Sequence, residues 1–134
     1  KKILMNKNYL AKIIAKDNNG LNLIAACCSG AKVSIKDIKF LKKNKIFLFF
    51  LERFKKEEDK NSEKINSICK FEFIEEVKSK NINQKSDEVV IELLAIDILK
   101  RNQIYEITLL FKNNAFITLF TEIIEATLED QIRA

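Results

Sequence analysis

The chain has 134 residues, of which 47% are hydrophobic and 32% are charged, a composition that predicts one globular domain over residues 1–134 and excludes a disordered chain. No apolar run approaches the roughly 20 residues that a membrane-spanning helix needs, so we expect no membrane partner. The net charge of +5 is unevenly placed, because residues 1–60 contain 15 basic and 6 acidic side chains and residues 61–134 contain 9 and 13.

The first third of the chain predicts short strands around one helix. We expect residues 1–8 to form a flexible N-terminal segment. Asp17 is a suitable helix N-cap and Gly30 a suitable left-handed residue after the last turn. Apolar residues recur between them at helical spacing, which predicts a helix from Asn18 to Ser29. The neighbouring strand predictions are Tyr9–Ala15, Ala31–Ile35 and Ile38–Leu41, with a turn at Lys42–Lys45 in which Asn44 takes a positive φ.

Two strongly apolar segments are expected to be central. Ile46–Arg53 has apolar residues at both odd and even positions, which predicts a strand that is central in a sheet or lies at an interface. Val89–Leu99 is the longest nearly uninterrupted apolar run. Its β-branched residues favour a strand covered on both faces, and a helix capped by Asp87 is the alternative.

The remaining segments complete a mainly antiparallel arrangement. Lys55–Glu63 is a charge run that predicts a mobile loop, and the Asn113–Asn114 pair predicts a hairpin turn. Glu122–Arg133 has the spacing of a closing helix. The further strand predictions are Ile68–Val77, Ile104–Phe111 and Ala115–Thr121. The expected fold is therefore α+β: an antiparallel sheet or small barrel of about seven to eight strands, with one early helix and a C-terminal helix.

Several short motifs recur in a known pattern, among them the segment Phe49–Phe54, Leu-Leu-Ala-Ile at 93–96 and Ile-Glu-Ala-x-Leu-x-Asp at 124–130. Together they resemble a small alphaproteobacterial family that is catalogued as domain of unknown function 2948, and the last two are its most specific motifs. The resemblance extends from about Tyr9 to Asp130, and it implies a bacterial cytoplasmic protein without assigning catalytic residues. The sequence departs from the family pattern at Lys55–Lys56, Asn81 and Asn113–Asn114.

The residue types that are missing exclude several kinds of site. Without histidine there is no Ser-His or Cys-His nucleophile, and two glycines ten residues apart cannot form a phosphate-binding loop. Cys27, Cys28 and Cys69 do not form a disulfide framework and fall short of a closed zinc site, so we expect buried thiols in a reducing cytoplasm and no cofactor.

Arg53 and Asp97 are the candidates for a polar site. Arg53 is one of three arginines in a chain with 21 lysines, which indicates a bidentate or stacked contact, or a structural ion pair with Glu75, Asp97 or Asp130. Asp97 and Glu92 interrupt the central apolar run. Each either lines a ligand cavity or marks where the strand leaves the core.

Three functions remain open from the sequence. The favoured one is a non-catalytic interaction or ligand-binding module that binds a protein partner, a second copy of itself or a small ligand. The alternative is a basic accessory protein that contacts RNA or DNA through residues 1–60, with affinity that falls with salt. The third is an enzyme that uses carboxylates, for which the sequence contains no recognisable catalytic motif.

Overall fold

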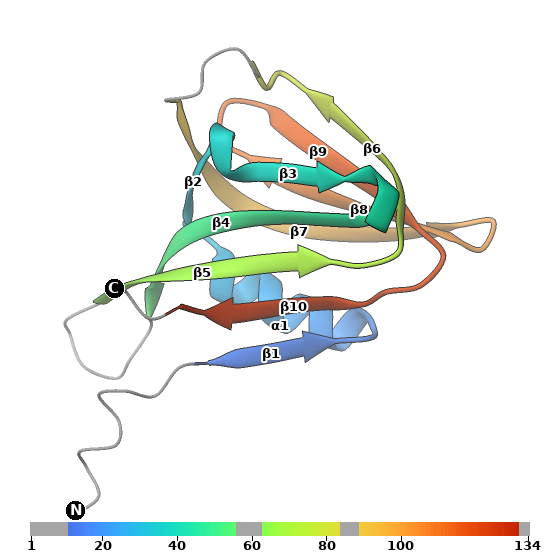
Figure 1. The fold of residues 1–134 in the computed structure, drawn as a ribbon, viewed down its shortest axis with the longest axis horizontal. Helices are drawn as coiled ribbons and strands as arrows, with labels where there is room; N and C mark the ends of the chain where they lie inside the picture. Colours follow the sequence, from blue (N-terminus) through green and yellow to red (C-terminus); the bar gives the residue numbers. More distant parts are fainter. Residues whose placement is uncertain (1–10, 56–62, 84–88, 132–134) are drawn as a thin grey trace, which may run out of the picture.

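The computed structural model describes residues 11–55, 63–83 and 89–131 of the chain. Most of these residues form one antiparallel sheet of ten strands, and one α-helix packs against it (Figure 1). In chain order the elements are β1 (Lys12–Ala15), α1 (Asn18–Cys28), β2 (Lys32–Ser34), η2 (Ile35–Asp37), β3 (Ile38–Leu41), η3 (Lys42–Asn44), β4 (Ile46–Lys55), β5 (Glu63–Phe71), β6 (Ile74–Lys80), β7 (Val90–Arg101), β8 (Ile104–Phe111), β9 (Ala115–Thr121) and β10 (Ala126–Asp130).

The strand order across the sheet is β1-β10-β5-β4-β2-β7-β8-β9-β6, and β3 pairs with β4. One edge of β4 pairs with β5 along its whole length, and the other edge pairs with β3 and, further along, with β2. The sheet curls until residues of β3 and β6 face one another across a cleft, but β3 pairs with β4 and β6 pairs with β9. The fold is therefore an open curled sheet and not a closed barrel.

The early helix is confirmed, together with both of its predicted ends. The Asp17 carboxylate accepts a hydrogen bond from the backbone N–H of Gly20 at 2.8 Å, and Gly30 has a φ of 86°. Leu21, Ile24 and Cys28 form the buried face of α1. Gly20 is required for close packing, because a Cβ there would lie 2.9 Å from the Cα of Ala15 in β1.

Val90–Arg101 and Ile46–Lys55 are central strands, as expected, but each is buried on one face only. In β4, Phe47 and Phe49 are fully buried, whereas Phe50 between Phe49 and Leu51 is 41% exposed. In β7, Leu93 is buried and Leu94 is 44% exposed. The expectation that Val89–Leu99 is covered on both faces was wrong, because the core fills only the inner face of the curled sheet.

The prediction of a C-terminal helix over Glu122–Arg133 was wrong. Residues 126–130 form β10, which inserts between β1 and β5 and pairs with both. Ala126, Leu128 and Asp130 face the core and alternate with Thr127 and Glu129. The helical spacing of the apolar residues did not decide the structure here. Pairing with strands on both edges gives the backbone N–H and C=O groups of β10 their hydrogen-bond partners.

The strand count also exceeds the prediction, because Ile68–Val77 is not one strand. The chain turns at Phe73, which has a φ of 61°, and separates β5 from β6. The positive φ that we expected at Asn44 occurs at Lys45 instead, since Asn44 ends the turn η3. Phe111 pairs with Ala115, so residues 112–114 form the hairpin loop, and Asn113 and Asn114 in it both have positive φ. The expected flexible segment 1–8, Tyr9, most of the charge run Lys55–Glu63 and the end of Glu122–Arg133 lie outside the described residues.

The core lies between the inner face of the sheet and α1. The rings of Phe47, Phe49 and Phe71 form its aromatic centre, with Phe47 6.2 Å from Phe49 and 6.4 Å from Phe71 between ring centroids. Leu21 and Ile24 of α1 pack against this core. Within the described ranges, no helix is both long and apolar enough to cross a membrane.

Candidate functional site

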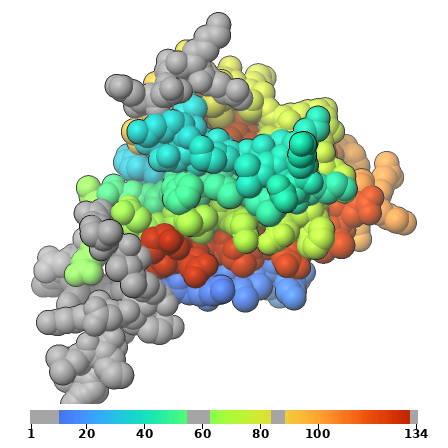
Figure 2. Space-filling model, in the orientation of Figure 1, coloured from blue at the N-terminus to red at the C-terminus, as the bar shows by residue number. Residues whose placement is uncertain are grey.

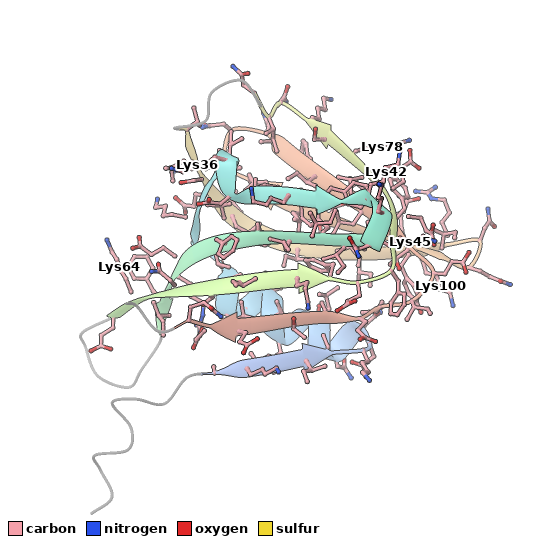
Figure 3. The ribbon with its side chains drawn as sticks, in the orientation of Figure 1. Lys36, Lys42, Lys45, Lys64, Lys78 and Lys100 are labelled. Carbon is pink, nitrogen blue, oxygen red and sulfur yellow. The ribbon has the colours of Figure 1, made fainter. Side chains whose placement is uncertain are left out.

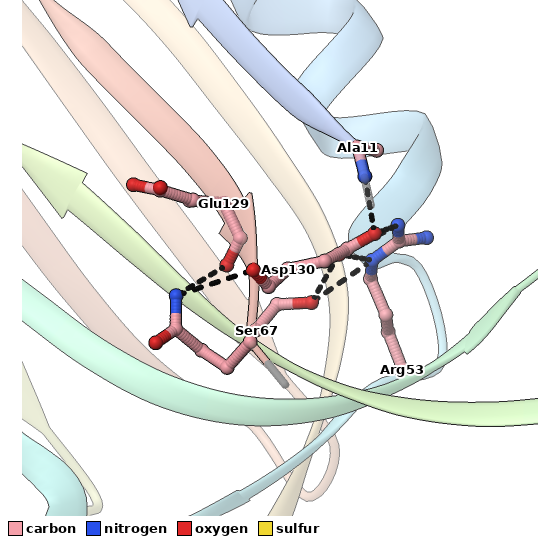
Figure 4. Close-up of polar contacts among 6 residues, drawn as sticks. Ala11, Arg53, Ser67, Glu129 and Asp130 are labelled. Carbon is pink, nitrogen blue, oxygen red and sulfur yellow. Dashed lines mark hydrogen bonds and ion pairs between the residues drawn. The ribbon is translucent and has the colours of Figure 1, made fainter. Parts of the chain in front are cut away.

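A buried polar network lies at one end of the core, where β4, β5 and β10 run side by side (Figure 4). Nη2 of Arg53 donates to both carboxylate oxygens of Asp130 at 2.9 Å, and Nε donates to Oδ1 at 3.2 Å and to Ser67 Oγ at 3.1 Å. Ser67 Oγ donates to Asp130 Oδ1 at 2.7 Å, and the backbone N–H of Ala11 donates to Oδ2 at 2.9 Å. All three side chains are buried.

The environment of Asp130 holds its carboxylate in the charged form. Burial works to raise the pKa of Asp130. Hydrogen bonds from Ser67, the Ala11 backbone and Arg53, together with the charge of Arg53, outweigh burial and lower the pKa below its usual value. A buried ion pair stabilises only when its polar atoms are satisfied, and this one has a bidentate contact and two further donors. The network therefore links β10 and Ala11, the residue before β1, to β4 and β5 through hydrogen bonds and an ion pair.

The structure does not bring Arg53 and Asp97 into one site. Of the three carboxylates proposed as partners for Arg53, Asp130 makes the ion pair. Asp97 lies in β7 opposite Thr108, and its side chain is exposed. Glu92 accepts a hydrogen bond from Lys32 at 3.0 Å, and this contact lowers the pKa of Glu92 while it links β7 to β2. A ligand-binding role for Arg53 with Asp97 stays a prediction.

The three cysteines are free thiols, with Cys28 and Cys69 buried and Cys27 partly buried. A hydrogen bond with Cys28, burial and the charge of Cys28 raise the pKa of Cys69 well above its usual value. A thiol that stays protonated is a poor nucleophile and a poor metal ligand. In the part of the chain that the structure describes, no group of three or more cysteine and carboxylate residues is placed to hold a metal ion.

The strongest candidate site is the cleft between β3 and β6, whose lining side chains are mostly apolar. Its volume is about 460 Å³, which falls within the usual range for small-ligand pockets. In Figure 1, β3 and β6 lie close together near η3 and diverge towards η2. In Figure 2 the cyan atoms of η2 and β3 border the yellow-green atoms of β6 along this line. We call this feature the β3–β6 cleft, and its lining residues are Ile35, Lys36, Ile38, Phe40, Phe47, Val77, Ser79 and Ile82.

Strand alternation explains why the cleft is apolar. Ile38 and Phe40 point from β3 into the cleft, and Lys39 between them is exposed on the opposite face. On β6, Val77 and Ser79 line the cleft and Lys78 is exposed. The two edges that the curled sheet leaves open thus present apolar side chains inward and lysines outward.

A second, larger depression lies on the outer face of the sheet beside β2, β4 and β5. Its volume is about 790 Å³. Its charged side chains are largely engaged with neighbours, because Lys32 pairs with Glu92 at 3.0 Å and Glu52 with Lys64 at 4.0 Å. The depression has both signs of charge and no buried polar group directed into it that lacks a partner among the described residues. The β3–β6 cleft has one charged residue in its lining, Lys36, and six aliphatic or aromatic ones, so we take it as the candidate site.

The model of a protein family of unknown function, DUF2948, matches residues 11–134. The chain belongs to this family. No curated protein and no solved structure matches the chain. Two motifs that resemble the DUF2948 pattern meet in the structure, because Arg53 lies in Phe49–Phe54 and Asp130 ends the motif at 124–130. The sequence contained this signal for the network, but it contained none for the cleft, whose lining comes from segments that look like ordinary core strands.

Proposed function

We propose that this protein is a non-catalytic binding module that takes an apolar ligand into the β3–β6 cleft. The observation that supports this function best is a cleft with mostly apolar lining side chains between the open edges of β3 and β6. Ligand sites in β folds commonly lie where a sheet fails to close on itself, since side chains there can contact a guest instead of a neighbouring strand.

The lining of the cleft favours binding over catalysis. Its two polar side chains are Lys36 and Ser79, and the remaining lining residues are aliphatic or aromatic. A hydrolytic or acid–base site needs a base within hydrogen-bond reach of a nucleophile or substrate. Among the described residues, no hydrogen bond joins Lys36 to Ser79, so these two side chains do not form such a pair. The three free thiols support a reducing compartment, and we propose the bacterial cytoplasm as the place where the module works.

The test is binding of the neutral dye N-phenyl-1-naphthylamine, whose fluorescence rises in apolar surroundings. The wild-type protein is expected to increase the fluorescence in a saturable way. Ser79→Phe places a ring into the cleft and is expected to abolish the increase, while the free energy of unfolding changes by less than about 0.5 kcal/mol because the ring enters open space.

Lys80→Phe is the matched control, because it adds the same ring one position along β6, where the exposed side chain of Lys80 does not line the cleft. This variant should bind the dye like the wild type. Equal fluorescence from Ser79→Phe and wild type would show that the dye binds elsewhere and would overturn the proposed site.

A further inference from the structure

Lys36 is set apart from the other lysines near the β3–β6 cleft by its place in the lining. It is the one charged residue among those that line the cleft, and its side chain is exposed at the η2 end of β3 (Figure 3). Lys45 pairs with Glu75 at 3.1 Å, and Lys78 lies 4.0 Å from Glu76 and 5.3 Å from the centre of the Phe120 ring. Among the described residues, no carboxylate pairs with the ammonium group of Lys36. Lys36 thus brings a cation to a cleft whose other lining side chains are mostly apolar.

We infer that the ligand of the cleft is an amphipathic carboxylate, with an unbranched or planar apolar tail inside the cleft and its carboxylate on Lys36. This inference rests on the proposed function and adds the chemical class of the ligand. The apolar side chains of the lining match the tail, and the ammonium of Lys36, the one charged group in the lining, matches one negative charge. A lysine can lay its methylene stem along the apolar wall and hold its charge in water at the mouth.

The surroundings of Lys36 support a carboxylate over a cationic or neutral ligand. Asp37 is the nearest carboxylate in the sequence, but it lines the larger depression beside β2, β4 and β5 and not the cleft. Lys36 is the one charged residue in the lining of the cleft, and its positive charge favours an anion over a cation.

The experiment measures the binding of a matched pair of probes, decanoate and decanol, by isothermal titration calorimetry at low ionic strength, with methyl NMR shifts to locate the bound probe. Decanoate is expected to bind about two- to fivefold more tightly than decanol, the range that one exposed ion pair supplies. Lys36→Gln should reduce the affinity for decanoate to that for decanol. Lys39→Gln removes a neighbouring charge on the other face of β3 and should leave the preference in place.

Two further measurements sharpen the test. In the series hexanoate, octanoate and decanoate, each added CH₂ group should strengthen binding by about fourfold until the tail fills the cleft. The shifted methyl groups should be those of Ile35, Ile38, Val77 and Ile82, and Ser79→Phe should remove binding of both probes.

The outcomes separate the two proposals. If decanol binds as tightly as decanoate and Lys36→Gln changes neither affinity, the inference that the ligand is a carboxylate is wrong. The proposal that the cleft binds an apolar ligand would be unaffected by that result. If neither probe nor the neutral dye binds, the proposed function fails as well. If a glutamate-rich peptide binds in the cleft more tightly than decanoate, the ligand class is a peptide and the inference is overturned.

Discussion

Two regions of the sheet differ in how their strand edges are used: the buried network of Arg53, Ser67 and Asp130, and the β3–β6 cleft. At the network, β10 pairs with β1 on one edge and β5 on the other, and every buried polar atom of the three side chains has a partner. At the cleft, β3 and β6 do not pair with each other, and the space between them is lined by apolar side chains and by Lys36, which has no carboxylate partner among the described residues. A buried charge that is fully paired stabilises the fold, whereas an unfilled apolar space with a free charge is suited to a ligand.

The comparison predicts that changes in the network lower stability and changes in the cleft lower binding. The cleft substitutions Ser79→Phe and Lys36→Gln should therefore leave stability nearly unchanged. The substitutions below test the other half of the contrast, in order of decreasing effect.

Asp130→Ala is expected to have the largest effect, a loss of about 3–5 kcal/mol in the free energy of unfolding, because it leaves the buried Arg53 guanidinium without its counter-charge. Urea denaturation followed by circular dichroism measures this loss. Arg101→Ala is the matched control. Arg101 pairs with Glu106 at 3.0 Å, but its side chain is 63% exposed, so we expect less than about 1 kcal/mol.

A second variant keeps this prediction testable if Asp130→Ala does not fold. The double variant Arg53→Met with Asp130→Leu removes both charges together and should recover much of the lost stability, since a pair of apolar residues leaves no buried charge unpaired. A double variant as unstable as Asp130→Ala would show that the network acts through something other than its charges.

The same carboxylate should give the protein an acid-sensitive stability. The folded state lowers the pKa of Asp130, so its contribution is present in full above the pKa of an unfolded aspartate, about 3.9. The contribution is lost as the pH falls through the lower pKa of the folded state. Urea midpoints measured from neutral to acidic pH should decline in the wild type, and Asp130→Asn should show a flatter decline. Equal slopes would contradict the assignment.

Phe73 lies at the corner that joins β5, which contributes Ser67 to the network, to β6, which lines the cleft. Its φ of 61° is unfavourable for a bulky residue, and its side chain is 44% exposed. Thr121 holds the corner by donating to the Phe73 carbonyl at 2.8 Å. Phe73→Gly should raise the free energy of unfolding by about 1 kcal/mol, because glycine adopts this conformation without strain.

Asn113→Gly is the control for this prediction. Asn113 also has a positive φ, 68°, but asparagine tolerates the left-handed region, so its replacement should change stability by only a few tenths of a kcal/mol. If Phe73→Gly instead lowers stability, the contacts of the ring outweigh the backbone strain.

The smallest expected effect concerns the outer face of β4. Phe50 is 41% exposed and lies opposite Ile68 of β5, which supports the expectation that this strand takes part in self-association. Analytical ultracentrifugation from low micromolar to near-millimolar protein should show weak dimerisation that Phe50→Ser reduces, while dye binding in the cleft is retained. A strict monomer over the whole range would exclude this interface.

Much of the fold could be predicted because it depends on local signals. Asp17 and Gly30 delimit α1, the Asn113–Asn114 pair sets a hairpin, and the apolar run at 89–99 forms a strand. The sequence could not show that the predicted C-terminal helix is wrong. Residues 126–130 form the strand β10 because they pair with β1 on one edge and with β5 on the other, and these strands are distant in the sequence. Asp130 was one of three proposed partners for Arg53, and only the pairing of β10 with β5 decides among them.

The sequence by itself determined the fold class, the early helix, most of the strands and the absence of histidine-dependent chemistry. These depend on residue type and on spacing within about ten residues, which the chain fixes before it folds. Only the tertiary structure decided that the sheet stays open, that Asp130 neutralises Arg53, and that Lys36 lines a cleft between β3 and β6. Each of these depends on which distant strands become neighbours, and that choice follows from how the whole core packs.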